Sequence, residues 1–314
     1  MSILIIFAVL FIVLLTIGVL FEILSMQWSK RRYKTPRGKL VDVDGHQLHI
    51  HVMGERQANQ SVVVLEAGVA SNSLDWQKVQ PKIAEFAQVV IYDRAGYGWS
   101  EKGKDPRSPQ QIVTELHTLL QNAVIEAPYL MVGHSFGGIY VRLFAETYPD
   151  EVAGLVLVES SVPSMIKAVN TAPEISRLKR VSRMKRIGLV RLMLARILTH
   201  SAHLEGEAKK EYLAMNMLDS DNVIREAVPM YEGITLSDRI DLPLIIISRE
   251  PFEELPSEKR WQDYQQELVE LSSTSRHIYT TSGSHYPALS EPDVVVRAVQ
   301  DMLGQISYKH KESQ

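Results

Sequence analysis

The first segment of the chain is apolar on every side of the helix that it predicts. Only one threonine, one glycine and Glu22 interrupt the run from Ile3 to Leu24. As a helix this run is about 33 Å long, enough to cross a hydrocarbon core of about 30 Å. Because the run lacks the basic start of a cleaved signal peptide, we expect residues 1–27 to form a transmembrane anchor.

Basic residues follow this predicted span within residues 28–39, which we expect to form a basic juxtamembrane linker. Trp28 opens this segment, at the level expected for lipid headgroups. Basic residues next to a span stay on the cytoplasmic side, so the pattern predicts a single-pass protein of the cell membrane whose main domain faces the cytoplasm. The basic residues are Lys30, Arg31, Arg32, Lys34, Arg37 and Lys39.

From residue 40 onward, short β-rich runs alternate with segments of helical spacing. This alternation predicts an α/β fold with a mostly parallel central sheet flanked by helices, a core in residues 40–160 and 243–305, and a polar tail in residues 306–314. The predicted strands are Leu40–Val43, Gln47–Val52, Val62–Leu65, Val89–Tyr92, Tyr129–Val132, Leu155–Val158, Leu244–Ile247 and His277–Tyr279. The predicted helices are Trp76–Phe86, Gln110–Val124, Gly138–Thr147, Trp261–Leu271 and Asp293–Leu303.

The alternation stops in residues 161–242, where no good strand pattern occurs. An α/β sheet accepts such an excursion over the carboxyl ends of its strands, so we expect a helical cap there. One stretch of this cap interleaves apolar residues with basic ones. It is either a solvated helix or a cationic amphipathic surface that lies on an anionic membrane leaflet. Its basic residues are Arg177, Lys179, Arg180, Arg183, Lys185, Arg186, Arg191 and Arg196.

Composition narrows the classes of function that this chain can have. Its 314 residues, 45% hydrophobic and 23% charged, suit one large α/β domain with an insertion. A net charge of -3 gives no overall cationic surface, so we expect no nucleic-acid partner. The absence of cysteine excludes a disulfide framework, a thiolate nucleophile and a sulfur-ligated zinc cluster.

The segment 133–137, Gly-His-Ser-Phe-Gly, matches the pattern G-x-S-x-G, which is weak by itself because chance matches are common. Its context strengthens it. A predicted strand runs directly into the segment and a helical pattern begins at Gly138, so Ser135 falls on a strand-to-helix turn. Such a turn needs glycine on either side and raises the hydroxyl at a helix N-terminus, where amide groups can receive negative charge. Ser135 is the candidate nucleophile; the alternative is a glycine-rich turn with an idle serine.

A serine hydroxyl is a poor nucleophile until a neighbouring base takes its proton. Of the ten histidines, only His285 follows the last predicted strand and precedes a helix, in the segment 282–287, Ser-Gly-Ser-His-Tyr-Pro. His49 and His51 alternate on one face of a strand and could pair on a metal ion, but no third ligand is evident. We therefore predict His285 as the general base, and neither a metal nor a cofactor.

The histidine needs a carboxylate to fix its tautomer and stabilise the imidazolium. Glu159 follows the predicted strand Leu155–Val158 without a gap and is favoured. Glu250 and Glu253 follow the next predicted strand, on a loop that contains proline, and remain alternatives. Each of the three could also be an ordinary surface glutamate.

Hydrolysis further needs two backbone amides to receive the negative charge of the intermediate. Phe136, directly after the candidate nucleophile, offers one of them. Val69 offers the other, because the segment 66–69, Glu-Ala-Gly-Val, follows an early strand and its Gly68 allows close approach. We expect Val69 and Phe136 to form the oxyanion hole.

Three ordered motifs together resemble the α/β-hydrolase superfamily, and within it the esterase-like and lipase-like serine hydrolases of bacteria. They are Tyr-Asp-Arg-Ala-Gly-Tyr-Gly-Trp-Ser at 92–100, Gly-His-Ser-Phe-Gly-Gly at 133–138 and Gly-Ser-His-Tyr-Pro at 283–287. The resemblance implies an α/β-hydrolase fold, a carboxylic-ester hydrolase, and Ser135 and His285 at the family's positions. The chain departs from the family's pattern in having Glu-Ala-Gly at 66–68 in place of His-Gly, and in lacking the usual late aspartate.

A serine at the nucleophile position argues against the dehalogenase and epoxide-hydrolase branches of this fold, which use a carboxylate. Acyl transfer remains, and the leading hypothesis is a membrane-anchored esterase that forms an acyl-enzyme from a small-molecule or lipid-derived apolar ester. The anchor and a methionine-bearing cap favour an apolar substrate. Amidase, peptidase or acyltransferase activity would use the same residues. From another class, a non-catalytic receptor or scaffold is an alternative.

Overall fold

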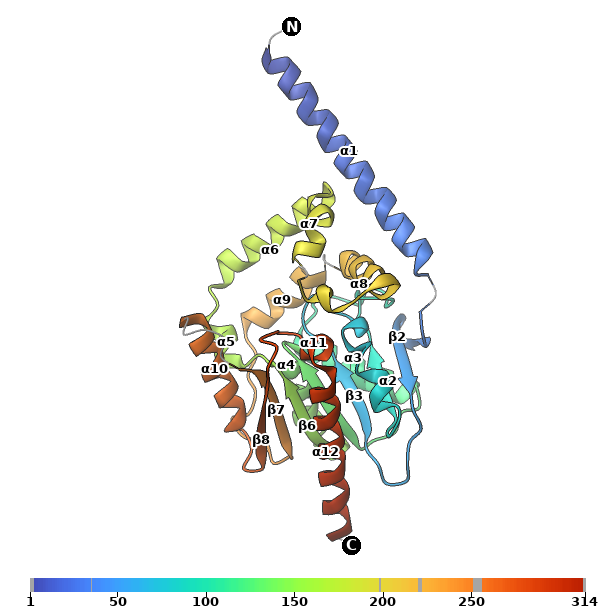
Figure 1. The fold of residues 1–314 in the computed structure, drawn as a ribbon, viewed down its shortest axis with the longest axis vertical. Helices are drawn as coiled ribbons and strands as arrows, with labels where there is room; N and C mark the ends of the chain where they lie inside the picture. The colour runs from blue at the N-terminus through green and yellow to red at the C-terminus, as the bar shows by residue number, and fades with distance from the viewer. Residues whose placement is uncertain (1–2, 35, 198, 220–221, 251–255, 313–314) are drawn as a thin grey trace.

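The β-rich runs assemble into one eight-stranded sheet in the order β1-β2-β4-β3-β5-β6-β7-β8 (Figure 1). This computed structural model describes residues 3–34, 36–197, 199–219, 222–250 and 256–312. β1 pairs antiparallel with β2 and β2 with β4, whereas all other neighbours are parallel. The strands are β1 Lys39–Val43, β2 His46–Met53, β3 Val62–Glu66, β4 Val89–Tyr92, β5 Tyr129–His134, β6 Val152–Val158, β7 Leu244–Arg249 and β8 Ser275–Thr280.

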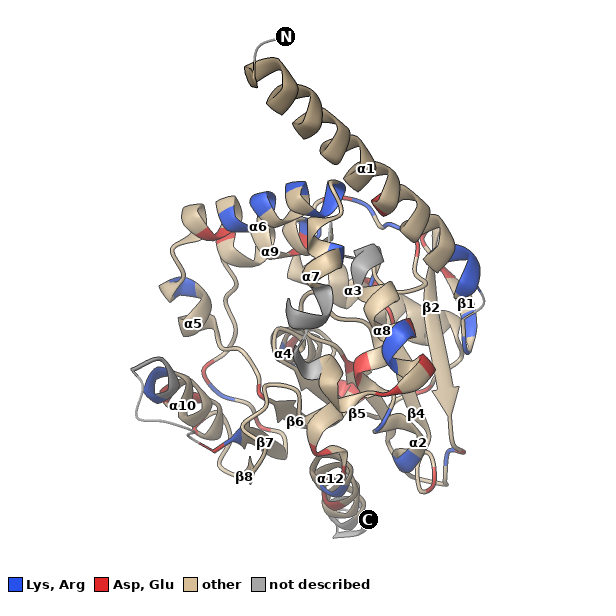
Figure 2. Ribbon diagram, turned by 45° about the horizontal axis from the view of Figure 1, so that its top comes forward, with Lys and Arg blue, Asp and Glu red and all other residues tan. Residues whose placement is uncertain are grey.

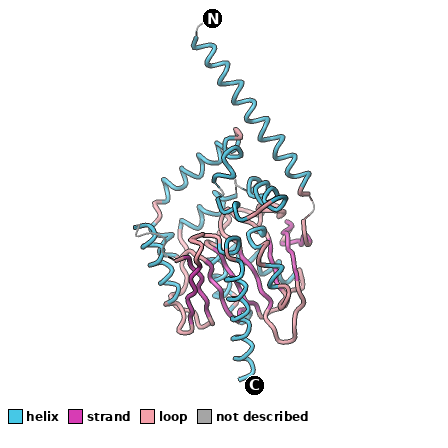
Figure 3. Tube along the Cα trace, in the orientation of Figure 1, coloured by secondary structure: helices cyan, strands magenta, loops and turns pink. Residues whose placement is uncertain are grey.

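Helices cover both faces of this sheet, and the strands form a single layer between them (Figure 3). Val62 and Val64 of β3 pack in one apolar core with α3 and α4, while Val63 and Leu65 pack in a second core with α2 and α12. Burial on both faces explains why the parallel strands are continuous apolar runs. The core helices are α2 Gln80–Ile83, α3 Pro109–Asn122, α4 Gly137–Thr147, α10 Pro256–Val269, α11 Pro287–Ser290 and α12 Pro292–Glu312.

The predicted cap segment contains helices only, within the described residues. In Figure 1, α6 to α9 lie on the side of the sheet from which α1 leaves, whereas the end of α12 lies on the opposite side. The cap therefore covers the carboxyl edge of the parallel strands. Its helices are α5 Pro163–Ala168, α6 Thr171–Arg186, α7 Leu189–Ile197, α8 Gly206–Asp219 and α9 Asn222–Glu232.

The apolar N-terminal segment forms α1, Ile3–Arg32, which is long and apolar enough to cross a membrane. The helix extends into the predicted linker, so residues 28–32 are helical rather than a free connection. No glycine or proline interrupts the chain there, and Lys30, Arg31 and Arg32 lie at the C-terminus of the helix dipole, which favours cations. The basic segment 28–39 therefore begins as the last turn of α1.

Two further boundaries differ from the prediction. The expected helix Trp76–Phe86 is a 3-10 turn at Ser73–Trp76 followed by the single turn of α2, because Pro81 lacks the amide that would bond back to the preceding turn. The expected polar tail is helical over its described part, since α12 continues to Glu312. Ile306, the first residue of that tail, is buried against the sheet.

Candidate active site

Ser135 lies on the sharp turn between β5, which ends at His134, and α4, which begins at Gly137. Its φ of +53° is in the left-handed region that L-residues rarely adopt. A Cβ on Gly133 would lie 2.7 Å from the carbonyl oxygen of Gly137, and a Cβ on Gly137 would lie 2.7 Å from that of Ala67. Glycine on both sides therefore allows the strained turn that holds the serine above the sheet.

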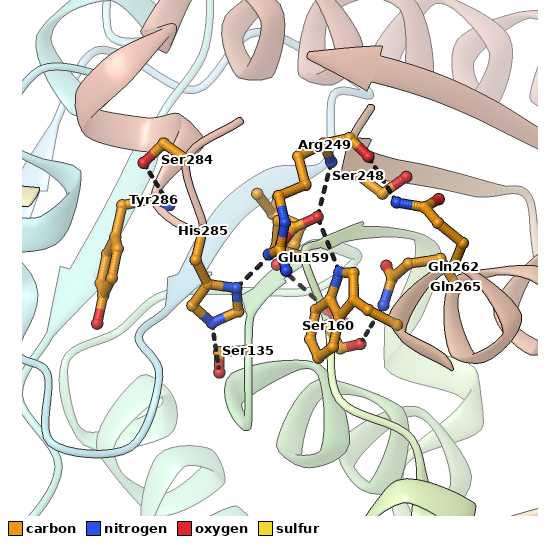
Figure 4. A network of polar contacts seen from close by, with 12 residues as sticks. Ser135, Glu159, Ser160, Ser248, Arg249, Gln262, Gln265, Ser284, His285 and Tyr286 are labelled. Atoms are coloured by element: carbon orange, nitrogen blue, oxygen red, sulfur yellow. Dashed lines mark hydrogen bonds and ion pairs between the residues drawn. The ribbon is translucent and has the colours of Figure 1, made fainter. Parts of the chain in front are cut away.

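His285 approaches this serine from the loop between β8 and α11 (Figure 4). Its Nε2 lies 3.2 Å from Ser135 Oγ, and its side chain is one-third exposed. The loop is held in place by His134, whose Nε2 lies 2.6 Å from the carbonyl oxygen of His285. The structure therefore gives His134, the second residue of the G-x-S-x-G segment, a positional role that the sequence pattern did not reveal.

Glu159 lies on the other side of the same imidazole, with its Oε2 3.0 Å from His285 Nδ1. It follows β6 directly, is fully buried, and has a φ of +47°. Its carboxylate also accepts hydrogen bonds from the backbone N–H of Arg249 at 2.7 Å, from the Arg249 guanidinium and from Trp261 Nε1 at 3.2 Å (Figure 4). A buried carboxylate is thus surrounded by donors.

Burial acts to raise the pKa of Glu159, but the hydrogen bond and charge of His285 and the charge of Arg249 outweigh it and hold that pKa below its ordinary value. The carboxylate therefore stays ionised at neutral pH. An ionised Glu159 accepts a hydrogen bond from the Nδ1–H of His285, which leaves Nε2 unprotonated and able to accept the Ser135 hydroxyl proton. The three residues form one continuous chain of hydrogen bonds.

Of the two alternative acids, Glu250 and Glu253, the structure describes only Glu250. Glu250 is exposed, and within the described residues its carboxylate makes no contact with His285. Glu253 lies outside the described residues. Arg249, one position before Glu250, was given no role by sequence reasoning; its guanidinium instead pairs with Glu159 and lies 5.1 Å from the ring centroid of Trp261.

Phe136 directly follows Ser135 in the chain, and Gly68, the residue before Val69, lies against the same turn. A Cβ on Gly68 would be 3.1 Å from Ser135 Cβ, so the segment that carries Val69 packs directly against the turn. Within the described residues, neither the Val69 N–H nor the Phe136 N–H donates a backbone hydrogen bond. Both amides are thus available to a bound oxygen.

A buried arginine fixes the backbone of residues 66–69, the segment that carries Val69 and that we call the oxyanion segment. Arg94 donates to the carbonyl oxygens of Ala67 and Gly68, each at 2.7 Å. Its guanidinium also pairs with Glu66 at 2.6 Å and, from the cap helix α9, with Glu226 at 2.9 Å. Sequence reasoning placed Arg94 in a motif but did not assign it this contact, because the partners are distant in the chain.

Two carboxylates share this single buried guanidinium. Burial raises the pKa of Glu66 to about 7, against the opposing charge of Arg94 and hydrogen bond of Tyr92, and the charge of Glu226 raises it further. Tyr140 donates a 2.5 Å hydrogen bond to Glu226. Glu66 can therefore hold a proton near neutral pH, next to the oxyanion segment.

The histidine pair that could in principle bind a metal has other partners. His49 Nδ1 lies 2.8 Å from Asp93 and its Nε2 lies 2.5 Å from the carbonyl oxygen of Arg37. His51 Nδ1 lies 3.1 Å from Gln80. Among the described residues, no group of three histidine or acidic side chains is placed to hold a metal ion.

Comparisons with known proteins agree with this architecture. A family model described as "alpha/beta hydrolase fold" matches residues 61–202. The uncharacterized protein YqjL of Bacillus subtilis is 25% identical over 264 residues, which cover 84% of this chain and 91% of that protein.

Two solved structures share the fold. The epoxide hydrolase CorEH is 19% identical with a TM-score of 0.67, covering 85% of this chain and 98% of its own. A thermophilic esterase from Thermogutta terrifontis is 17% identical with a TM-score of 0.67, covering 87% of this chain and 100% of its own. The predicted fold class is confirmed. Sequence identities below 20% do not indicate which substrate this chain acts on.

Replacing Glu66 by glutamine tests the raised pKa of this carboxyl group. Its pKa rises from 4.5 to about 7 on folding. Protonation therefore favours the folded state, and this stabilisation is complete below the unfolded pKa and is lost as the pH rises through the folded one. Between about pH 5 and pH 8, we expect the free energy of unfolding of the wild type to fall relative to Glu66→Gln by on the order of 3 kcal/mol. Denaturant unfolding of the solubilised chain measures this; a difference constant with pH would contradict it.

Proposed function

Because the chain has the α/β-hydrolase fold and a family model of that description matches residues 61–202, we propose that it is a membrane-anchored serine hydrolase that cleaves carboxylic esters of apolar acyl groups. The observation that carries the proposal is the hydrogen-bond chain from Ser135 through His285 to Glu159. A hydroxyl, an imidazole and a carboxylate in this order form the arrangement that turns a serine into a nucleophile. The neighbouring amides of Val69 and Phe136 complete what acyl transfer requires.

In the proposed reaction, His285 Nε2 takes the Ser135 proton as Oγ attacks the carbonyl carbon of the ester. The resulting oxyanion accepts hydrogen bonds from the N–H groups of Val69 and Phe136. The intermediate then breaks its bond to the alcohol, which leaves with the proton from His285. A water molecule hydrolyses the acyl-enzyme by the same steps, and Glu159 stabilises the imidazolium both times.

The apolar acyl group is inferred from the surroundings of the site. Tyr231 of the cap helix α9 packs edge-on against Phe136, with ring centroids 6.2 Å apart. Met230, which is fully buried, and Met165 belong to or pack against the same apolar cluster as Phe136. An aromatic and thioether cluster that includes the residue after the candidate nucleophile suits a hydrocarbon chain.

We further propose that α1 crosses the membrane once and that the hydrolase domain faces the cytoplasm. The apolar length of α1 supports the span. The cations Lys30, Arg31 and Arg32 in its last turn, with Lys34 and Arg37 beyond, support the orientation, because basic flanks stay on the cytoplasmic side.

Removal of the nucleophile tests the enzyme class. Ser135→Ala should lose covalent labelling by a fluorophosphonate probe and nearly all turnover of p-nitrophenyl esters, with unchanged thermal stability. Ser164→Ala is the matched control, because that hydroxyl donates to Glu267 and should not affect labelling. Wild-type labelling of Ser135→Ala would contradict the assignment. Faster turnover of amides, or acyl transfer to an alcohol, would instead favour an amidase or an acyltransferase.

The acid is tested by exchanging a carboxylate for an amide of the same shape. In Glu159→Gln the side chain no longer holds the His285 tautomer or balances the imidazolium, so kcat should fall by up to about 10⁴-fold. The exposed Glu250 is the control, and Glu250→Gln should stay near the wild-type rate. A near-normal Glu159→Gln beside a severely impaired Glu250→Gln or Glu253→Gln would contradict this choice.

The orientation is tested by protease added to intact cells. The hydrolase domain should survive, because the membrane separates it from the protease, and should be digested once the cells are permeabilised. Digestion in intact cells would place the domain outside and would leave the enzyme class untouched.

A further inference from the structure

The C-terminal half of α1 packs against the cap instead of standing apart from it. At Gly18 the contact is backbone to backbone, because a Cβ there would lie 2.4 Å from the carbonyl oxygen of Ile187. Gly188, at the turn between α6 and α7, meets Gly18 in return, since its Cβ would lie 2.9 Å from the Gly18 carbonyl oxygen. Two glycines thus let the α6–α7 turn touch the helix.

An ion pair one turn further along strengthens this contact. Arg191 of α7 donates from Nε and Nη2 to the two carboxylate oxygens of Glu22, at 2.9 and 3.1 Å. The side chain of Glu22 is 4% exposed and that of Arg191 14%. Glu22, the acid within the apolar run, is therefore neutralised by the cap, as a charge at membrane depth requires.

Polar contacts continue along the end of α1. Arg32 and Tyr33 contact Glu207 of α8 at 2.8 and 3.1 Å, and Arg37 contacts Glu211 at 3.2 Å. The contacts with the cap therefore change from backbone packing at Gly18 to charged groups at Arg32 and beyond. This order matches the change from the hydrocarbon region to the aqueous boundary.

The position of these contacts along α1 decides how deep the cap lies. Gly18 is six residues before the end of the apolar run at Leu24, which corresponds to about 9 Å along a helix. If α1 spans the bilayer, Gly18 lies inside the leaflet that contains the C-terminal part of the span. The α6–α7 turn, which touches Gly18, then lies inside that leaflet too.

Side chains on α7 suit that depth. Leu189, Leu192 and Met193 are 40%, 73% and 44% exposed, and Phe21 and Leu24 of α1 are 41% and 63% exposed. A cavity of about 530 Å³ lies between the two helices and α8, with Leu24, Trp28, Leu192, Leu213 and Lys210 in its lining. In water this apolar surface would be unfavourable, whereas acyl chains would cover it.

Cations line the neighbouring helix. Figure 2 shows lysine and arginine residues along α6, on the side of the cap from which α1 leaves. A row of exposed cations next to an apolar patch is the pattern of a segment that lies on an anionic membrane surface. The exposed cations are Arg177, Lys179, Arg180, Arg183 and Arg186.

We propose that the cap is a second membrane contact: α7 inserts its apolar face into the leaflet beside α1, and the α6 cations bind the headgroups of anionic lipids. This inference rests on the proposed span of α1. It fixes the cap against the bilayer, so that the candidate active site beneath the cap is held within reach of esters dissolved in the membrane.

The absence of cysteine makes this insertion directly measurable. Single-cysteine variants of the full chain, Leu192→Cys on α7, Ile12→Cys within the span and Val124→Cys just after α3, are labelled with a polarity-sensitive fluorophore. Val124 is 79% exposed and precedes β5, at the edge of the sheet opposite the cap. The proteins are reconstituted in vesicles of phosphatidylcholine and phosphatidylglycerol with doxyl groups on the acyl chains.

Quenching of the Leu192 label should approach that of the Ile12 label, while the Val124 label stays unquenched. An unquenched Leu192 label beside a quenched Ile12 label would overturn the inference and leave the anchor standing. If both labels stay unquenched, the anchor fails and the inference with it. Neither result depends on enzymatic activity. A failure of the proposed ester hydrolysis would show in the turnover and labelling measurements and not in the quenching.

The α6 cations are tested in the same system. Quenching at Leu192 should weaken in vesicles of phosphatidylcholine alone, and also when Arg180→Glu and Arg183→Glu are combined with the Leu192→Cys label. Quenching at Ile12 should not change in either case, because the span inserts by its apolar length. Equal quenching at Leu192 under all three conditions would overturn the role of the cations.

Discussion

The burial of Arg94 is the constraint on which the arrangement of this molecule depends. A guanidinium removed from water is stable only when charged and polar partners surround it. Arg94 finds them in Glu66 at the end of β3, in the carbonyl groups of Ala67 and Gly68, and in Glu226 of the cap. One side chain thereby joins the sheet, the oxyanion segment and the cap, so the cap cannot leave without exposing a buried charge.

A second constraint arises from the register of two parallel strands. β5 and β6 are paired so that His134 lies opposite Val158, and each strand is followed at once by a residue with positive φ. These residues are Ser135 and Glu159, and the Ser135 N–H donates to the carbonyl oxygen of Val158 at 3.1 Å. The candidate nucleophile and acid are thus fixed by neighbouring strand ends, and His285 needs only one loop to reach both.

The same logic of paired charges extends to the anchor. Glu22 would destabilise an isolated membrane helix, and Arg191 would leave a charge on the apolar side of α7. Their pairing removes both problems and fixes the angle between the helix and the cap. At the candidate active site and at the proposed membrane contact alike, buried ion pairs connect segments that are far apart in the sequence.

The sequence by itself determined those features that depend on local pattern. Apolar length predicted α1, period and turn residues predicted the strands, and glycines around Ser135 together with the strand before His285 singled out two residues for the site. These signals are local because steric and hydrophobic preferences act over a few positions.

Only the tertiary structure decided the features that depend on distances across the fold. Sequence reasoning favoured Glu159 but left Glu250 and Glu253 open, since separation along the chain does not measure the distance between neighbouring strand ends. The partners of Arg94 and Glu22 were hidden for the same reason. The pairs Arg94–Glu226 and Glu22–Arg191 each join residues more than a hundred positions apart. The low dielectric of the interior makes such contacts decisive only once packing has brought the residues together.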